Sequence, residues 1–221
     1  MSGKKKELVS LIIGYLGAFL GVYGVISFNQ FVLMSLPLGL RMVCMIVTYW
    51  LIALVPVIVM AVSKDKLAGY WNTDKIGYQI LTGVLIGIAM SLVLTLVPHL
   101  AGFGAYVDNG KRYIYLWQFV YEFFYCIVAI GFVEELVFRG FVYNRIKKIS
   151  QNEIAAVIGS SVLFGVFHLF GGNIVQMIMT AFIGAFFCLC RLKIKNCSVL
   201  SLVIAHGIYD ALIAVWASIL L

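Results

Sequence analysis

Gly131-Phe-Val-Glu134-Glu135-Leu-Val-Phe-Arg139-Gly140 places two adjacent carboxylates and an arginine in a long apolar run. Ionisable groups inside a bilayer are costly and therefore rare, and they usually face a bundle interior or a water-filled cavity. A cluster of them in an apolar segment is therefore a candidate for function. We expect the function of this chain to depend on Glu134.

The rest of the chain is also strongly apolar. Its 221 residues are 63% hydrophobic and only 11% charged, with a mean hydropathy of +1.07. A soluble domain of this length could not bury so much apolar surface in one core. The apolar runs are continuous, whereas a β-barrel would show short alternating segments. We predict an all-α, polytopic transmembrane helical bundle that forms one membrane domain over residues 1–221.

The apolar runs, separated by short polar or basic segments, predict seven membrane spans. They cover residues 8–28, 42–62, 78–98, 114–141, 154–170, 174–189 and 199–221. An eighth span is expected if residues 28–40 also enter the membrane. Residues 1–113 carry no signature of function, whereas residues 114–221 contain Glu134, Glu135 and Arg139.

Glycines recur at intervals of three and four residues in two of the predicted spans. They are Gly14, Gly17, Gly21 and Gly24 in the first span and Gly83 and Gly87 in the third. Small residues at this spacing let a neighbouring helix approach closely. We predict that both glycine faces are packing surfaces.

The net charge of +7 comes from basic residues in short clusters between the apolar runs. This placement is typical of membrane topology signals, so no nucleic-acid partner is expected. With a cytoplasmic N-terminus, 13 of the 16 basic residues fall on the cytoplasmic side. The 13 are Lys4, Lys5, Lys6, Lys64, Lys66, Lys75, Arg139, Arg145, Lys147, Lys148, Arg191, Lys193 and Lys195. We expect a multi-pass protein embedded in the lipid bilayer of a bacterial plasma membrane.

The two adjacent glutamates cannot share one face of a helix, because each residue turns by about 100°. Glu135 and Arg139 are four residues apart and can pair, which would hold Glu135 ionised and leave Glu134 to point elsewhere. The alternative is that both acids are interfacial charges near the cytoplasmic end of the helix.

Two later spans carry polar side chains that need a shared partner. His168 follows Phe164 by four residues in an aromatic segment, and His206 and Asp210 lie on one helix face by the same spacing. Imidazoles and a carboxylate that converge from separate helices are typical of metal or hydrolytic sites in bundle interiors. Glu134 is the candidate partner.

The ordered set Glu134-Glu135-x-x-x-Arg139, Phe164-x-x-x-His168 and His206-x-x-x-Asp210 resembles the three main motifs of the CPBP family. This family comprises the type II CAAX prenyl endopeptidases and the bacterial Abi, or bacteriocin self-immunity, proteins. The resemblance covers about residues 114–221 and implies that they form the catalytic core helices. The last motif of the family ends in Asn or Asp, and the Asp of this chain differs from the Asn typical of eukaryotic prenyl proteases.

The resemblance implies hydrolysis of a peptide bond within the membrane. Glu134 would be the general base, with His168 orienting and activating the attacking water. His206 and Asp210 would stabilise the oxyanion of the tetrahedral intermediate. An ionised Asp210 repels an oxyanion, so we expect it to orient and charge His206 or to be protonated.

The remaining motif residues, Glu135, Arg139 and Phe164, are expected to support these groups.

The resemblance leaves the cofactor open between one divalent metal and none. Family members are commonly described as metalloproteases, and Glu134, His168 and His206 would make a three-ligand zinc site with an open position. A metal-free glutamate mechanism uses the same residues. The sequence contains no HExxH, which excludes a zincin-type helix.

The expected depths of these residues in the membrane differ. At about 1.5 Å per residue, Glu134 and His206 lie roughly 10 Å from the cytoplasmic boundary, and His168 roughly 20 Å. They can meet if the fifth helix tilts, begins below the membrane plane or follows a cytoplasmic turn, for which residues 145–151 are available. We predict a water-filled catalytic cavity between the C-terminal helices, open to the cytoplasm, because hydrolysis in lipid needs a route for water.

The leading hypothesis is an intramembrane endopeptidase that acts on a membrane-associated peptide or protein. Prenylated CAAX ends are one substrate class of the family, while peptide maturation or bacteriocin self-immunity suits a chain this small. A second hypothesis is a non-proteolytic immunity or scaffold protein of the same fold. However, a site without catalytic activity has no reason to retain costly buried charges. A third is a proton-coupled transporter or a channel in which Glu122, Glu134 and the histidines relay protons or ions, for which the sequence offers no inverted repeat or paired broken helices.

Overall fold

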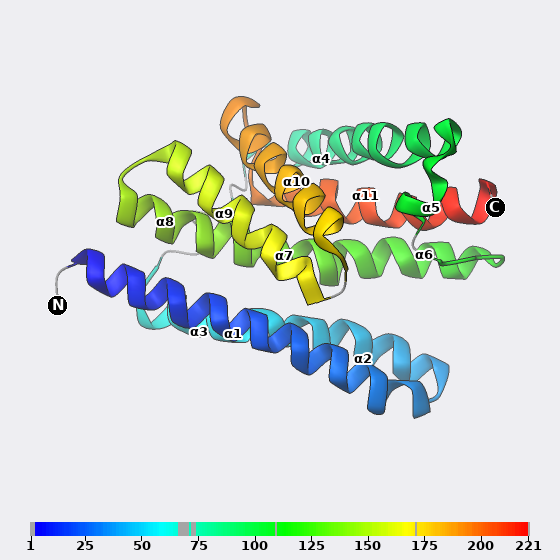
Figure 1. Cartoon of the computed structure of the whole chain (residues 1–221), viewed down its shortest axis with the longest axis horizontal. Helices are drawn as coiled ribbons and strands as arrows, with labels where there is room; N and C mark the ends of the chain where they lie inside the picture. The colour runs from blue at the N-terminus through cyan, green and yellow to red at the C-terminus, as the bar shows by residue number, and fades with distance from the viewer. Residues whose placement is uncertain (1–2, 66–70, 72–73, 109, 171, 221) are drawn as a thin grey trace. The chain divides into compact units, whose positions relative to one another are not determined.

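The computed structural model describes residues 3–65, 71, 74–108, 110–170 and 172–220, and contains helices and no strand among them (Figure 1). Six of the described helical segments are long and apolar enough to cross a membrane: Gly3–Ser35, Leu38–Val62, Ile76–Val107, Leu116–Ser150, Ile174–Lys193 and Val199–Leu220. A shorter apolar helix covers Glu153–Phe167. The predicted polytopic helical fold is thus confirmed. Lys66, which the charge count includes, lies outside the described residues.

The segment proposed for an eighth span is a connection. Helix α1 (Gly3–Phe31) ends in a single turn, η1 (Leu33–Ser35), and α2 (Leu38–Trp50) begins directly after Pro37. The Arg41 guanidinium donates hydrogen bonds to the carbonyls of Met34 and Leu36, each at 3.1 Å. Carbonyls that the helix end leaves without intrahelical donors are satisfied in this way. Within the described residues 28–40 there is therefore no additional membrane-spanning helix.

The chain divides into two compact units, and each is discontinuous in sequence. The first unit comprises Met1–Trp71 and Val133–Lys195, and the second comprises Asn72–Phe132 and Asn196–Leu221. Both the segment without signature and the segment with the motifs contribute to each unit. The units are described separately below, and a single domain over residues 1–221 stays a prediction.

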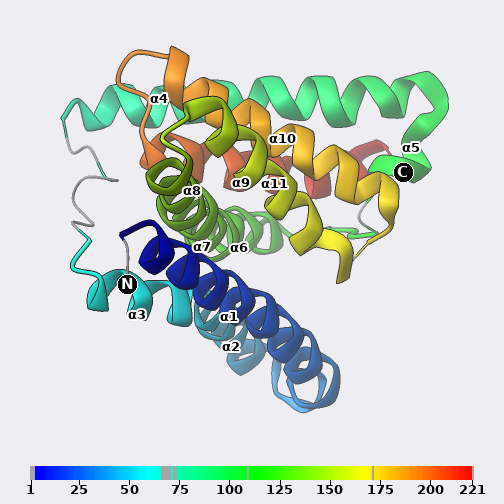
Figure 2. The same ribbon diagram turned by 60° about the vertical axis from the view of Figure 1, so that its left-hand side comes forward.

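In the first unit, the N-terminal helix packs against the hairpin that follows it. Helix α1 lies alongside η2 (Leu51–Ala53), α3 (Leu54–Val62) and α8 (Tyr143–Ser150), as Figures 1 and 2 show. A Cβ added at Gly21 would lie 3.0 Å from the Ile52 Cα, and one at Gly17 would overlap the Val55 side chain. The predicted glycine face is therefore a packing surface over these two positions, whereas no described atom lies within 4 Å of a Cβ added at Gly24.

The end of the first unit is held by buried charges. Helix α8 includes Arg145, which the sequence places in a basic linker but which is only 2% exposed in the structure. Its guanidinium pairs with Glu7 of α1 and with Asp65, and Lys148 reaches the same Asp65 carboxylate at 2.8 Å. The fourth predicted span thus continues as helix well past residue 141, because its last turns carry partners for these charges.

In the second unit, α4 (Ile76–Ser91) and α11 (Val199–Leu220) approach closely along the predicted second glycine face. A Cβ added at Gly83 would lie 2.5 Å from the Ser201 carbonyl oxygen, and one at Gly87 would lie 2.7 Å from that of Ala205. Across the same pair of helices, the Trp216 indole donates to the Ser91 hydroxyl at 2.6 Å. This glycine face is confirmed as a packing surface.

The second unit also contains the helical segments that follow α4 and those that pack against α11. Helix α4 continues as η4 (Leu92–Leu96), η5 (His99–Phe103) and α5 (Gly104–Val107), with a break at Gly102, where φ is 88°. The third span therefore extends beyond its predicted end at residue 98. Helix α6 (Leu116–Tyr125) and the π-helical η6 (Cys126–Gly131) pack against α11.

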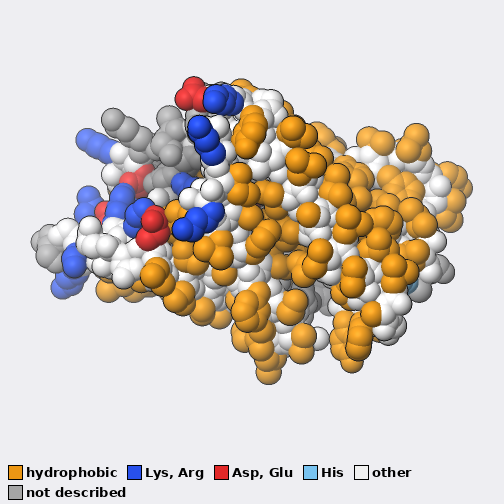
Figure 3. Space-filling model, turned by 90° about the horizontal axis from the view of Figure 1, so that it is seen from above, with side chains coloured by type: hydrophobic (Ala, Val, Ile, Leu, Met, Phe, Trp, Pro, Cys, Tyr) orange, Lys and Arg blue, Asp and Glu red, His pale blue; other side chains and the backbone are white. Residues whose placement is uncertain are grey.

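The surface agrees with a membrane environment. Figure 3 shows that hydrophobic side chains cover most of the face in view. Large apolar side chains point outward on the predicted spans, among them Leu20, Val93 and Phe182, whose exposed fractions are 67%, 62% and 68%. Such side chains are stable against lipid and unstable against water.

The glycine face of α4 allows a test of this packing. We expect Gly87→Ala to lower the free energy of unfolding by about 1–3 kcal/mol, because the new Cβ would force α4 away from the backbone of α11. Gly77→Ala is the matched control in the same helix, since no described atom lies within 4 Å of its added Cβ. It should be neutral or stabilise by up to about 1 kcal/mol through helix propensity. Equal unfolding midpoints of the two variants in detergent would contradict the close approach.

Candidate active site

A helical hairpin in the first unit brings the first two motifs together. The helical segment Leu116–Ser150 ends at Gln151, whose φ of 56° turns the chain, and α9 (Glu153–Phe167) begins after Asn152. The Asn152 side chain caps α9 by accepting from the Ala155 amide at 3.1 Å. Glu134 lies 17 residues before Gln151, and His168 lies 17 residues after it. The expected difference in depth is therefore removed by the helical extension that residues 145–151 provide.

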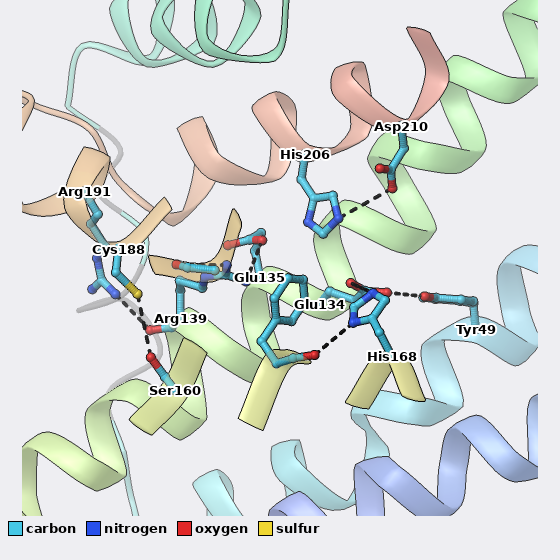
Figure 4. A network of polar contacts seen from close by, with 12 residues as sticks. Tyr49, Glu134, Glu135, Arg139, Ser160, His168, Cys188, Arg191, His206 and Asp210 are labelled. Carbon is cyan, nitrogen blue, oxygen red and sulfur yellow. Dashed lines mark hydrogen bonds and ion pairs between the residues drawn. The ribbon is translucent and has the colours of Figure 1, made fainter. Parts of the chain in front are cut away.

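Glu134 and His168 face each other in the first unit. Glu134 belongs to α7 (Phe132–Glu135), and His168 begins the short η8 (His168–Phe170). The His168 Nε2 atom is 3.6 Å from the Glu134 Oε2 atom, and only 3% of the carboxylate side chain is exposed. The other carboxylate oxygen, Oε1, accepts a hydrogen bond from the hydroxyl of Tyr49, as Figure 4 shows. Each oxygen of this carboxylate thus has its own neighbour.

The imidazole of His168 is oriented by backbone and by aromatic rings. Its Nδ1 atom lies 2.9 Å from the Phe164 carbonyl oxygen, one helical turn earlier. Its ring packs edge-on against the rings of Phe164 and Phe167, with centroids 4.6 and 5.7 Å away. Phe138, which is fully buried, contacts both of these phenyl rings in the same geometry. The aromatic residues around His168 therefore fix the direction of its Nε2 atom.

Glu135 is paired in the way that the spacing predicts. Its Oε1 atom lies 2.9 Å from the Arg139 guanidinium, and the side chains are 0% and 1% exposed. The π-helical η7 (Leu136–Val142) carries this arginine, so Arg139 is buried within a helix and does not lie in a cytoplasmic segment as the charge count assumes. The guanidinium also donates to the Gly184 carbonyl at 3.3 Å and stacks on the Phe164 ring at 4.4 Å.

The third motif lies in the second unit. His206 and Asp210 share one face of α11, with 3.5 Å between the His206 Nε2 and Asp210 Oδ2 atoms. His206 is buried, whereas 24% of the Asp210 side chain is exposed. The structure therefore brings the site residues together as two pairs, one in each unit.

The sequence patterns do not predict the contact of one polar residue, Tyr49, and they suggest a different role for another, Glu122. Tyr49 is a single tyrosine in an apolar run, 85 residues from Glu134, and nothing in its local sequence signals a contact. Glu122, a relay residue in the transporter hypothesis, is bound within the second unit by Lys111 at 2.5 Å and by the Tyr113 hydroxyl at 2.6 Å. This ion pair explains how a buried carboxylate is tolerated at that position.

The facing atoms of Glu134 and His168 also fit two ligands of one zinc ion. Zinc bonds of about 2.0–2.2 Å to nitrogen and oxygen place tetrahedral ligands roughly 3.3–3.6 Å apart. Within either unit, the described residues contain no group of three His, Cys, Asp or Glu side chains that could hold a metal. If zinc is used, Glu134 and His168 would be two of its ligands, and the ion would supply a water of lowered pKa and polarise a carbonyl group.

Taken with the fold, these contacts define a multi-pass membrane protein with a buried carboxylate beside an imidazole. Residues 116–212 match the family model of the Rce1-like type II CAAX prenyl endopeptidases. The match confirms the resemblance that the three motifs indicate, and it covers the segment that carries them. Comparisons of the chain with curated proteins and with solved structures give no match.

The burial of the Glu135–Arg139 pair gives a prediction about stability. Arg139→Ala should lower the free energy of unfolding by about 3–5 kcal/mol, because it leaves a buried carboxylate without its cation. Arg112→Ala removes the cation of a pair with the same spacing, Asp108–Arg112, in which the arginine is 41% exposed. There the Arg112 guanidinium lowers the pKa of the Asp108 carboxyl to about 2, but solvent screens the pair.

Unfolding in mixed micelles, followed by tryptophan fluorescence, measures both variants. We expect little or no change for Arg112→Ala. A loss of stability of similar size in both variants would contradict the role of burial.

Proposed function

We propose that this chain is an intramembrane endopeptidase that hydrolyses a peptide bond of a membrane-associated peptide or protein, with Glu134 as general base. The observation that carries the proposal is the 3.6 Å approach of the His168 Nε2 atom to the Glu134 Oε2 atom. A backbone carbonyl can only accept, so the contact with the Phe164 oxygen assigns the proton of the neutral ring to Nδ1. Nε2 is then an acceptor, and it faces an acceptor oxygen of the carboxylate.

Two acceptors at this spacing suit a water molecule that donates one hydrogen to each, at about 2.8 Å from both. The lone pairs of that water then point away from the protein atoms and toward a peptide carbonyl carbon. As the new C–O bond forms, Glu134 takes a proton from the water. When the tetrahedral intermediate collapses and the C–N bond breaks, Glu134 returns this proton to the leaving amine.

For His206 and Asp210 we propose stabilisation of the oxyanion. The 3.5 Å separation of the His206 Nε2 and Asp210 Oδ2 atoms supports a role for the aspartate as the group that orients and charges the imidazole. This arrangement avoids placing an ionised carboxylate against a developing negative charge.

The substrate classes that the family suggests are prenylated CAAX ends and, for a compact bacterial form, peptides in maturation or bacteriocin self-immunity. We propose a bacterial plasma membrane with a cytoplasmic N-terminus as the setting. A farnesylated CAAX peptide and the same peptide without the lipid are therefore the first two probes, because a comparison of their cleavage tests whether a prenyl group is required.

The central prediction concerns two buried glutamates that lie on one helical segment. Glu134→Gln should lower the cleavage rate of either probe by about 100-fold or more, because the base is lost while the shape of the side chain is kept. Glu122→Gln is the control, since that residue is also only 3% exposed but pairs with Lys111. Its cleavage rate per folded molecule should stay within a few fold of wild type. Retained turnover in Glu134→Gln would contradict the proposed function.

Metal dependence is decided by a separate measurement. Elemental analysis of the purified wild type is compared with that of a His168→Ala/His206→Ala variant, alongside the cleavage assay. Near-stoichiometric zinc that is lost in the variant together with activity would establish a metalloprotease. Cleavage without metal, unaffected by chelators, would assign the chemistry to Glu134 and its imidazole partners.

A further inference from the structure

Tyr49 lies outside the three motifs, yet its hydroxyl reaches the carboxylate on which the proposed chemistry depends. It is the penultimate residue of α2 and belongs with Glu134 to the first unit. An ionised carboxylate can only accept hydrogen bonds, so the phenol is the donor and the Glu134 Oε1 atom is the acceptor. Hydrogen bonds of this charge-assisted kind are shorter and stronger than neutral ones.

We propose that Tyr49 is a positioning residue of the protease, which holds the Oε1 atom of Glu134 so that the Oε2 atom is presented to water beside His168. The inference rests on the proposed function. It assigns the two oxygens of one carboxylate to different tasks: Oε1 is fixed by the tyrosine, and Oε2 takes the proton.

The need for such a group follows from the glutamate side chain. Its terminal torsion is broad, so a carboxylate attached only through its own chain rotates over a wide range. A general base must lie within hydrogen-bond reach of the water it deprotonates, and a misplacement of about 1 Å costs on the order of 100-fold in rate. A donor fixed at one oxygen removes this rotation without occupying the oxygen that reacts.

The backbone around Tyr49 is itself held firmly. Three residues after it, Ile52 is 1% exposed, and its Cα would lie 3.0 Å from a Cβ added at Gly21 of α1. This close helix approach holds the backbone at the end of α2 and the start of η2, from which the phenol extends. The N-terminal helices, which carry no signature, thereby supply a residue to the site.

Tyr49→Phe removes the hydroxyl and leaves the ring. We expect kcat for the CAAX peptide probe to fall by about 10- to 100-fold, while KM changes by less than about threefold. Tyr15→Phe is the matched control, because Tyr15 is a part-buried tyrosine of the same unit whose hydroxyl donates to the Leu163 carbonyl at 3.0 Å. Its kcat should equal that of wild type, and the unfolding midpoints of the two Phe variants should agree.

Infrared difference spectra provide a readout that needs no turnover. Tyr49→Phe should shift a carboxylate stretching band relative to wild type. The same substitution in a Glu134→Gln background should leave that band region unchanged, and Tyr15→Phe should leave it unchanged in both backgrounds.

The outcomes separate this inference from the proposed function. A wild-type kcat in Tyr49→Phe, or the absence of the band shift, would overturn the positioning role of Tyr49. If Glu134→Gln were inactive in the same assay, the proposed protease function would still stand. An equal loss of kcat in both Phe variants, or a lower midpoint for Tyr49→Phe alone, would make the hydroxyl merely structural. Full activity of Glu134→Gln would overturn the proposed function itself, and with it the role of Tyr49.

Discussion

The first unit depends on the buried ion pair between Glu135 and Arg139. A charge at this depth is stable only with its counter-ion and further hydrogen bonds, and the guanidinium finds these on two other helices. It donates to the Gly184 carbonyl of α10 (Ile174–Lys193) and lies over the ring of Phe164 on α9. The Phe164 carbonyl in turn contacts the imidazole of His168. One arginine thus joins the helix of the glutamates to the helix of the histidine.

The two neighbouring glutamates differ only in their surroundings. Glu135 has a fixed cation, whereas Glu134 has a phenol at one oxygen and an imidazole at the other. Identical side chains take different chemical roles when their environments differ in this way. A turn of about 100° per residue is sufficient to separate them, since it directs adjacent side chains to different neighbours.

Hydropathy and four-residue spacings predict much of this structure, because both are local properties of the chain. They give the helical membrane fold, the Glu135–Arg139 pair and the shared face of His206 and Asp210. They do not give Tyr49, because the contact of its hydroxyl joins residues 85 positions apart. They also misplace Arg145, since a basic cluster near a predicted span end looks like a loop until the carboxylates that bury it are known.

The position of the hairpin turn at Gln151 also has a consequence for biosynthesis. Tyr49, Glu134 and His168 are all translated before α10 and α11, and the last two of them lie on either side of the turn at Gln151. A ribosome adds about 5–20 residues per second, so Gly184, which is 16 residues after His168, follows it by roughly 1 to 3 s. During that interval the nascent chain already contains its carboxylate, phenol and first imidazole, but lacks the Gly184 carbonyl that receives Arg139. The contacts of Arg139 can therefore be completed only after the later helices have been synthesised.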